Sequence, residues 1–61
     1  PVEGMDLREH LARIEAGIIR EALARAGGGV AHAAQLLRMS RTTLIERLRK
    51  YNLSSADFSQ S

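Results

Sequence analysis

The chain has no cysteine, almost no aromatic residues and no long apolar run. Without cysteine it cannot form a disulfide framework or a thiolate zinc site, and this fits a reducing compartment. Tyr51 and Phe58 are too few to form a stacking platform for single-stranded nucleic acid. No apolar stretch approaches the roughly 18 residues of a membrane span, and no signal-peptide pattern is present. We therefore expect no membrane partner.

Motifs typical of catalytic, phosphate-binding or metal-binding sites are also missing from the sequence. The sequence shows no glycine-rich phosphate loop and no pairing of a nucleophile with a base. His10 and His32 are isolated and are interpreted as surface residues, not as part of a metal cage. We therefore expect no catalytic residue, no metal site and no cofactor, and we do not expect an enzyme.

The length of 61 residues limits the chain to one domain. A domain of this size buries only about 60% of its unfolded surface, so oligomerisation is the expected additional source of stability. The chain begins with Pro1 and not with methionine, which indicates a fragment of a longer protein. We expect a leader or linker end over residues 1–5, a folded domain over 6–53 and a disordered, serine-rich tail over 54–61.

Positive charge is concentrated in the second half of the chain. Residues 1–26 carry four arginines against five acidic residues, whereas residues 38–51 carry five cationic residues against one acidic residue. A basic cluster on one short element is typical of a protein that binds a polyanion. The alternative is a solvated helix face that binds nothing.

Residues 6–26 predict one long helix with two apolar stripes. Asp6 is placed to cap this helix, and Glu9 follows three residues later as in a capping box. Ile19 and Leu23 belong to one stripe. Two short helices can cover only one stripe, so the other predicts dimerisation through the long helix. The predicted dimerisation residues, at 4-3-4 spacing, are Leu7, Leu11, Ile14 and Ile18.

Two short helices joined by a turn follow, which predicts an all-α helix-turn-helix fold. The glycine run "GGG" ends the long helix, and a short helix is expected over residues 30–37. Ser40 is a good N-cap for a third helix over residues 41–51. Gly27 and Asn52 can take the left-handed positions that end the first and third helices. Leu44, Leu48 and Tyr51 recur at helical spacing and define its buried side.

The opposite side of the third helix predicts an interface with double-stranded DNA. Arg41 and Thr43 are placed to reach base edges or the first phosphates of a major groove. Arg49 and Lys50, about two turns later, are expected to meet backbone phosphates. An ordinary helical hairpin without a ligand is the alternative. The candidate DNA-binding residues are Arg38, Ser40, Arg41, Thr42, Thr43, Glu46, Arg47, Arg49 and Lys50.

Glu46 has two interpretations. A carboxylate in the middle of a DNA-facing side can accept a hydrogen bond from cytosine N4. The alternative is a pairing with Arg49 or Lys50 that only shapes the surface.

The stretch "GGGVAHAAQLLRMSRTTLIERLRKYNL" resembles the Fis-type helix-turn-helix that closes sigma-54-dependent bacterial enhancer-binding activators of the nitrogen-regulator type. The matching features are the glycine run, "AA-x-LL", "S-R-x-T-L" and "R-K-Y", over about residues 14–53. The "T-T-L-I-E-R" run is similar to the flagellar master regulators of this family. Departures are Gly29, Arg38, Ile45 and Glu46, where the family often has Asn, Gly, an aromatic and a basic residue.

The resemblance implies a cytoplasmic, nucleoid-associated domain that binds enhancer-like sites as a homodimer. It also implies that RNA polymerase with sigma-54 is engaged through an ATPase domain outside this chain. Two alternatives stay open: a helical dimerisation or partner-docking domain without DNA binding, and a free-standing nucleoid protein of the Fis type.

Overall fold

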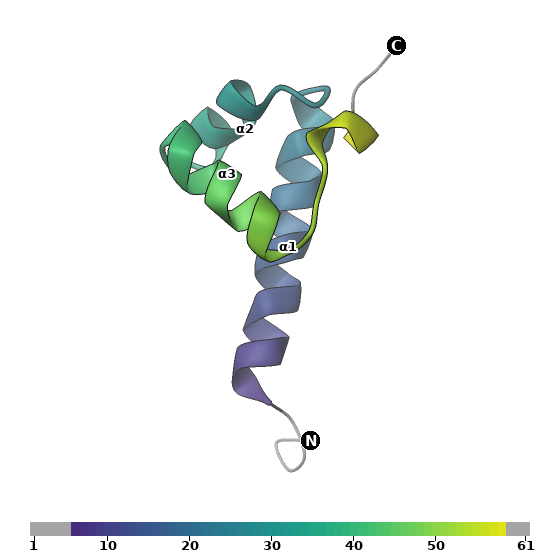
Figure 1. Cartoon of the computed structure of the whole chain (residues 1–61), viewed down its shortest axis with the longest axis vertical. Coiled ribbons are helices and arrows are strands. Elements are labelled where there is room, and N and C mark those ends of the chain that lie inside the picture. The colour runs from purple at the N-terminus through teal and green to yellow at the C-terminus, as the bar shows by residue number, and fades with distance from the viewer. Residues whose placement is uncertain (1–5, 59–61) are drawn as a thin grey trace.

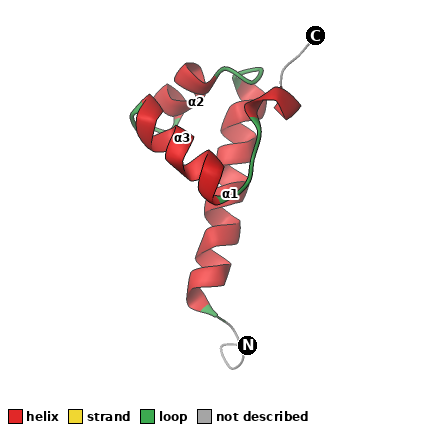
Figure 2. Ribbon diagram, viewed as in Figure 1, coloured by secondary structure: helices red, strands yellow, loops and turns green. Residues whose placement is uncertain are grey.

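Three α-helices and one short 3-10 helix make up residues 6–58, the part of the chain that the computed structural model describes. The elements are α1 (Leu7–Arg25), α2 (Val30–Leu36), α3 (Arg41–Lys50) and η1 (Ser55–Phe58). Helices α2 and α3 pack against the C-terminal half of α1, whereas its N-terminal half projects beyond them (Figures 1 and 2). The predicted long helix and helix-turn-helix pair are confirmed. The expected leader over residues 1–5 lies outside the described residues.

Helix α1 begins at a side-chain cap, but not at a complete capping box. The Asp6 carboxylate accepts hydrogen bonds from the backbone N–H groups of Arg8 at 3.0 Å and Glu9 at 3.5 Å. The Glu9 carboxylate does not reach back to Asp6; it accepts a hydrogen bond from Nη2 of Arg13 at 2.6 Å. The ion pair one turn along the helix therefore replaces the reciprocal half of the box.

All three α-helices end with a residue in the left-handed region. Gly27 has φ of +62°, Arg38 of +55° and Asn52 of +56°. Each end has the two backbone hydrogen bonds of a Schellman closure. At the end of α3, for example, the N–H of Leu53 donates to the carbonyl of Leu48 at 2.8 Å. The predicted closures at Gly27 and Asn52 are confirmed. Arg38 is the exception in chemistry, because glycine and asparagine tolerate this region whereas a longer side chain is strained there.

The start of α2 shows the effect of another departure from the family pattern. Gly29 is its N-cap and offers no side-chain hydrogen bond to the first turn. Asparagine at this position would supply one. This short helix therefore depends on its packing, through Ala33 and Ala34, both of which are buried.

One core joins the three helices. Helix α1 contributes Ile19 and Leu23, and α3 contributes Leu44; all three side chains are at most 2% exposed. Ala33 and Ala34 of α2 are buried in the same cluster, and α2 packs against both α1 and α3. The buried residues of this cluster are Ile19, Ala22, Leu23, Ala33, Ala34, Leu44 and Leu48.

The 4-3-4 stripe of α1 lies outside this core. Leu7 is 66% exposed, Leu11 53%, Ile14 47% and Ile18 52%, whereas Ile19 is 2% exposed. The short helices thus cover the stripe that contains Ile19, as expected, and leave the other open. Four large aliphatic side chains in one row are an apolar surface without a cover in the described chain.

Residues 55–58 belong to the tail that was expected to be disordered, and they have a defined conformation in the structure. Ser55–Phe58 form η1, and the Phe58 side chain packs, half-buried, against the shared core. Figure 1 shows η1 beside the C-terminal half of α1. The Phe58 ring is the contact of this turn with the apolar core. Residues 59–61 lie outside the described residues.

Candidate nucleic-acid interface

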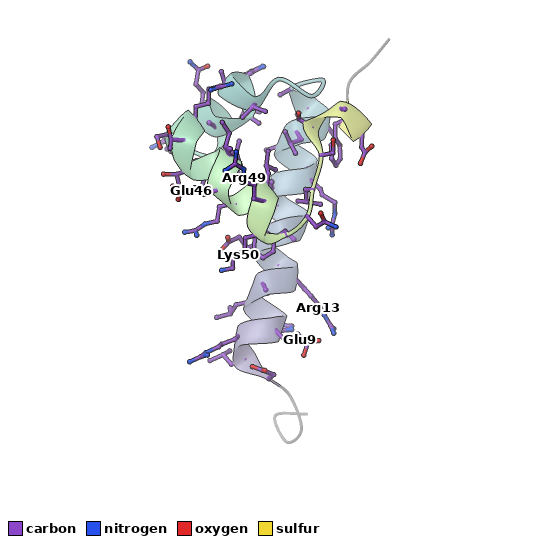
Figure 3. All side chains as sticks on the ribbon, in the orientation of Figure 1. Glu9, Arg13, Glu46, Arg49 and Lys50 are labelled. Carbon is purple, nitrogen blue, oxygen red and sulfur yellow. The ribbon has the colours of Figure 1, made fainter. Side chains whose placement is uncertain are left out.

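Helix α3 buries one side and presents the other to solvent. Leu44 and Leu48 are buried and Tyr51 is half-buried, as the sequence predicts. Figure 3 shows Glu46 pointing away from the rest of the chain, with Arg49 and Lys50 on later turns of the same helix. The exposed residues of the turn and of α3 are Arg38, Ser40, Arg41, Thr42, Glu46, Arg49 and Lys50; Thr43, Ile45 and Arg47 are half-buried.

The N-terminus of α3 is ordered by Ser40. Its hydroxyl oxygen accepts a hydrogen bond from the N–H of Thr43 at 3.1 Å, and its own O–H donates to Oγ1 of Thr43 at 2.8 Å. The N–H groups of Arg41 and Thr42 have no partner within residues 6–58. Two free amides at the positive end of a helix dipole favour an anion such as a phosphate.

Arg38 lies in the turn that separates α2 from α3. Its N–H closes α2 by donating to the carbonyl of Gln35 at 3.1 Å, and its side chain is exposed. The guanidinium therefore extends from a fixed backbone position close to the N-terminus of α3. This geometry suits a second phosphate contact beside the first-turn amides.

Arg47 has a partner inside the chain that the sequence analysis missed. Its Nε lies 3.2 Å from Oε1 of Glu15 in α1, and both side chains are less than half exposed. The pair links the recognition-helix candidate α3 to the long helix. No local spacing connects positions 15 and 47, so only the tertiary fold reveals the contact. Arg47 is thus less free for DNA than Arg41 or Arg49.

Tyr51 belongs to the same junction. The Glu15 carboxylate raises the pKa of the Tyr51 phenol above its ordinary value of 10.0, mainly through a hydrogen-bonding interaction. Desolvation and the negative charge of Glu15 act in the same direction, whereas the charge of Arg47 opposes them. Nζ of Lys50 lies 5.4 Å from the centroid of the Tyr51 ring, at cation–π distance.

Glu46 does not form the ion pair with Arg49 or Lys50 that its spacing predicts. The ion pairs within residues 6–58 are Arg13–Glu9, Arg25–Glu21 and Arg47–Glu15, so Glu46 pairs with neither Arg49 nor Lys50. Its carboxylate is exposed at the middle of the outer side of α3. The remaining interpretation of Glu46 is contact with a hydrogen-bond donor outside the chain.

Other classes of site leave no trace in the described residues. From Asp6 to Phe58, no group of three or more histidine and acidic side chains gathers as metal ligands. None of the helices there combines the length and apolar character that a membrane crossing requires. What the described chain offers is a hydroxyl-capped, cationic helix on a small helical core.

The comparison with known proteins agrees with this geometry. No solved structure matches the chain. The family described as "Bacterial regulatory protein, Fis family" matches residues 10–51, more than half of the chain, including most of α1 and all of α2 and α3. This is a family of helix-turn-helix regulators and not of enzymes. The chain belongs to the Fis family of bacterial regulatory proteins.

Proposed function

We propose that this chain binds double-stranded DNA with sequence preference, by inserting α3 into the major groove. The observation that carries the proposal is the solvent-exposed outer side of α3. That side combines free first-turn amides, arginine side chains and a single unpaired carboxylate. The major groove of DNA is wide enough to admit an α-helix, and its base edges differ for every base pair.

Contacts divide into two kinds. Arg41 is exposed in the first turn of α3 and is assigned to base edges, because a guanidinium can donate two hydrogen bonds to guanine. Glu46 is assigned to a cytosine amino group. Arg38, Arg49 and Lys50 are assigned to phosphates, which fix the position of α3 without reading sequence. Ser40 and Thr43 order the N-terminus of α3.

The proposed binding unit is a homodimer joined through α1. The open stripe of Leu7, Leu11, Ile14 and Ile18 supports this, because a two-fold pairing of identical helices covers both stripes at once. Two copies of α3 then address two half-sites of one DNA duplex.

Within the Fis family, we assign the chain to the sigma-54-dependent activators, and within these to the flagellar regulators. The motif order "S-R-x-T-L" and "R-K-Y" supports the first assignment, and "T-T-L-I-E-R" supports the second. The domain then places an activator at enhancer-like sites, while an ATPase domain outside this chain acts on RNA polymerase with sigma-54.

Titration of the 61-residue chain with fluorescent duplex DNA tests the proposal. We expect binding whose logarithmic affinity falls linearly with the logarithm of salt concentration, by about 0.9 for each phosphate neutralised. Selection from random duplexes should return a two-part site. A partner-docking helical domain, by contrast, would bind no duplex at low salt, and that result would overturn the proposal.

A further inference from the structure

The apolar surface of α1 does not end with its open stripe. An open groove of about 300 Å³ between α1 and α2 is lined by the apolar residues Ile18, Ala22, Leu36 and Leu37 and by the ion pair of Glu21 with Arg25. Ile18 belongs to the stripe and is 52% exposed, and Leu36 of α2 is 48% exposed. A cavity of about 150 Å³ already accepts a benzene-sized group, so the groove has room for an aliphatic side chain.

We propose that this groove receives Leu7 of a second copy of the chain, from the N-terminal end of its α1. The inference rests on the proposed dimer and adds its orientation and its contact with α2. The midpoint of the stripe lies between Leu11 and Ile14. An antiparallel two-fold pairing about that point sets Leu7 of each copy against Ile18 of the other, at the edge of the groove.

Charge complementarity favours this arrangement. In the antiparallel pairing, Arg8 of one copy lies opposite Glu15 of the other, and the two-fold axis repeats the contact. Arg8 forms no ion pair within residues 6–58, and the Glu15 side chain remains 44% exposed beside Arg47. Its carboxylate can therefore accept a second guanidinium from the partner copy. A parallel pairing sets Leu7 against Leu7 and leaves the groove uncovered.

Cysteine pairing tests the geometry directly, since the chain has no cysteine of its own. A Leu7→Cys chain is mixed with a Leu36→Cys chain in a glutathione redox buffer. A disulfide requires Cα atoms about 4.4–6.8 Å apart, so it reports close contact. Leu7 cannot reach the groove of its own chain. It lies about 16 Å along α1 from Ile18, which borders the groove, at 1.5 Å per residue.

We expect the mixture to form the disulfide-linked heterodimer as its main product. Leu7→Cys alone should stay unlinked. The matched control is His32→Cys, at an exposed position of α2 that does not line the groove, and it should stay unlinked when mixed with Leu7→Cys. Efficient linkage of Leu7→Cys to itself would show a parallel dimer and overturn the proposal, as would equal linkage at positions 32 and 36.

A cysteine-free measurement separates the groove from the dimer as a whole. Leu36→Ala should raise the dimer dissociation constant about tenfold or more in sedimentation equilibrium, because a buried leucine loses its contact. Gln35→Ala, on the neighbouring exposed position, should leave it unchanged. If the chain dimerises and binds DNA while Leu36→Ala has no effect, the groove contact is wrong and the proposed function stands. If the chain is monomeric, both the groove and the dimer are wrong, and DNA titration still tests the rest.

Discussion

Oε1 of Glu15 in α1 lies 3.2 Å from Nε of Arg47 in α3, and the pair sits beside the Tyr51 ring. This contact fixes how the C-terminal end of α3 rests on the long helix. Both side chains are more than a third exposed, so the pair contributes at most about 1 kcal/mol to stability. Its importance is geometric, because it orients the helix that presents the cationic surface.

Tyr51 reports on this contact, because the chain has one tyrosine and no tryptophan. We expect Glu15→Gln to lower the pKa of Tyr51 toward its ordinary value of 10.0, since Glu15 is the largest cause of the upward shift. Ultraviolet titration of the phenol measures this directly. The Glu21→Gln variant, at an exposed position elsewhere on α1, should leave the pKa unchanged.

The same shift predicts how stability depends on pH. The folded state raises the pKa of Tyr51, so it favours the neutral phenol. This contribution is fully present below the unfolded pKa near 10.0 and is lost as the pH rises through the raised folded value. Denaturant unfolding at a series of alkaline pH values should show the loss, and Tyr51→Phe should remove it. An identical alkaline loss in Tyr51→Phe would contradict the assignment.

Arg38→Gly should separate stability from DNA binding. Arg38 has φ of +55°, a conformation that costs a non-glycine residue about 1–2 kcal/mol. After the entropy that glycine gains in the unfolded chain, we expect a net stabilisation of about 0.5–1 kcal/mol in urea unfolding. DNA affinity should nevertheless fall, with a salt slope smaller by about 0.9, because one phosphate contact is lost. A stabilised variant with unchanged DNA binding would remove Arg38 from the interface.

Ser40 tests the anion site at the start of α3. Aspartate caps a helix as well as serine does, so Ser40→Asp should keep the stability of the wild-type chain in thermal unfolding. Its negative charge beside the free N–H groups of Arg41 and Thr42 should repel a phosphate and weaken DNA binding. Ser40→Ala, by contrast, should lower the free energy of unfolding by about 1 kcal/mol, because the cap is lost. It adds no negative charge, so it should not repel a phosphate.

Arg41 and Lys50 are expected to differ in kind. Arg41→Ala should weaken binding to a selected site by about 1–3 kcal/mol more than binding to random duplex, because a base contact is lost. Lys50→Ala should weaken both by the same factor and reduce the salt slope by about 0.9. Competition titrations with the two DNAs measure both quantities. Equal losses of preference in the two variants would contradict the division into base and phosphate contacts.

Glu46→Gln should lower selectivity without lowering overall affinity. The change removes a negative charge from the middle of the DNA-facing side, so binding to random duplex should strengthen. At the same time it weakens acceptance of a hydrogen bond from cytosine, so the ratio of selected to random affinity should fall. Selection experiments on both proteins would show whether one cytosine position becomes degenerate.

The sequence predicts those features that depend on local patterns. Helical spacing identified the buried Leu44 and Leu48, and turn chemistry identified the ends of α1 and α3 at Gly27 and Asn52. These features are decided within one or two helical turns, where spacing and propensity act directly. The same helical periodicity predicted which side of α3 faces solvent.

Features that depend on distant contacts could not be predicted in this way. The pairing of Glu15 with Arg47 and the docking of Phe58 join segments that no periodicity relates. In the sequence, Leu36 is one more apolar residue of a short helix. Only the folded structure shows that its side chain is half exposed at the edge of a groove. Arg38 was expected in the turn, but its left-handed backbone conformation emerged only from the way α2 closes.

The projection of α1 beyond the other helices has a consequence for amide hydrogen exchange. Its C-terminal turns are enclosed by the core, whereas the turns before Ala12 have helical hydrogen bonds but exposed side chains. A helical segment of this length is marginal by itself in water. In dilute solution one continuous helix should therefore contain both slowly and rapidly exchanging amides. If protection of the amides from exchange extends toward Leu7 as protein concentration rises, it will show which residues of α1 become covered on dimerisation.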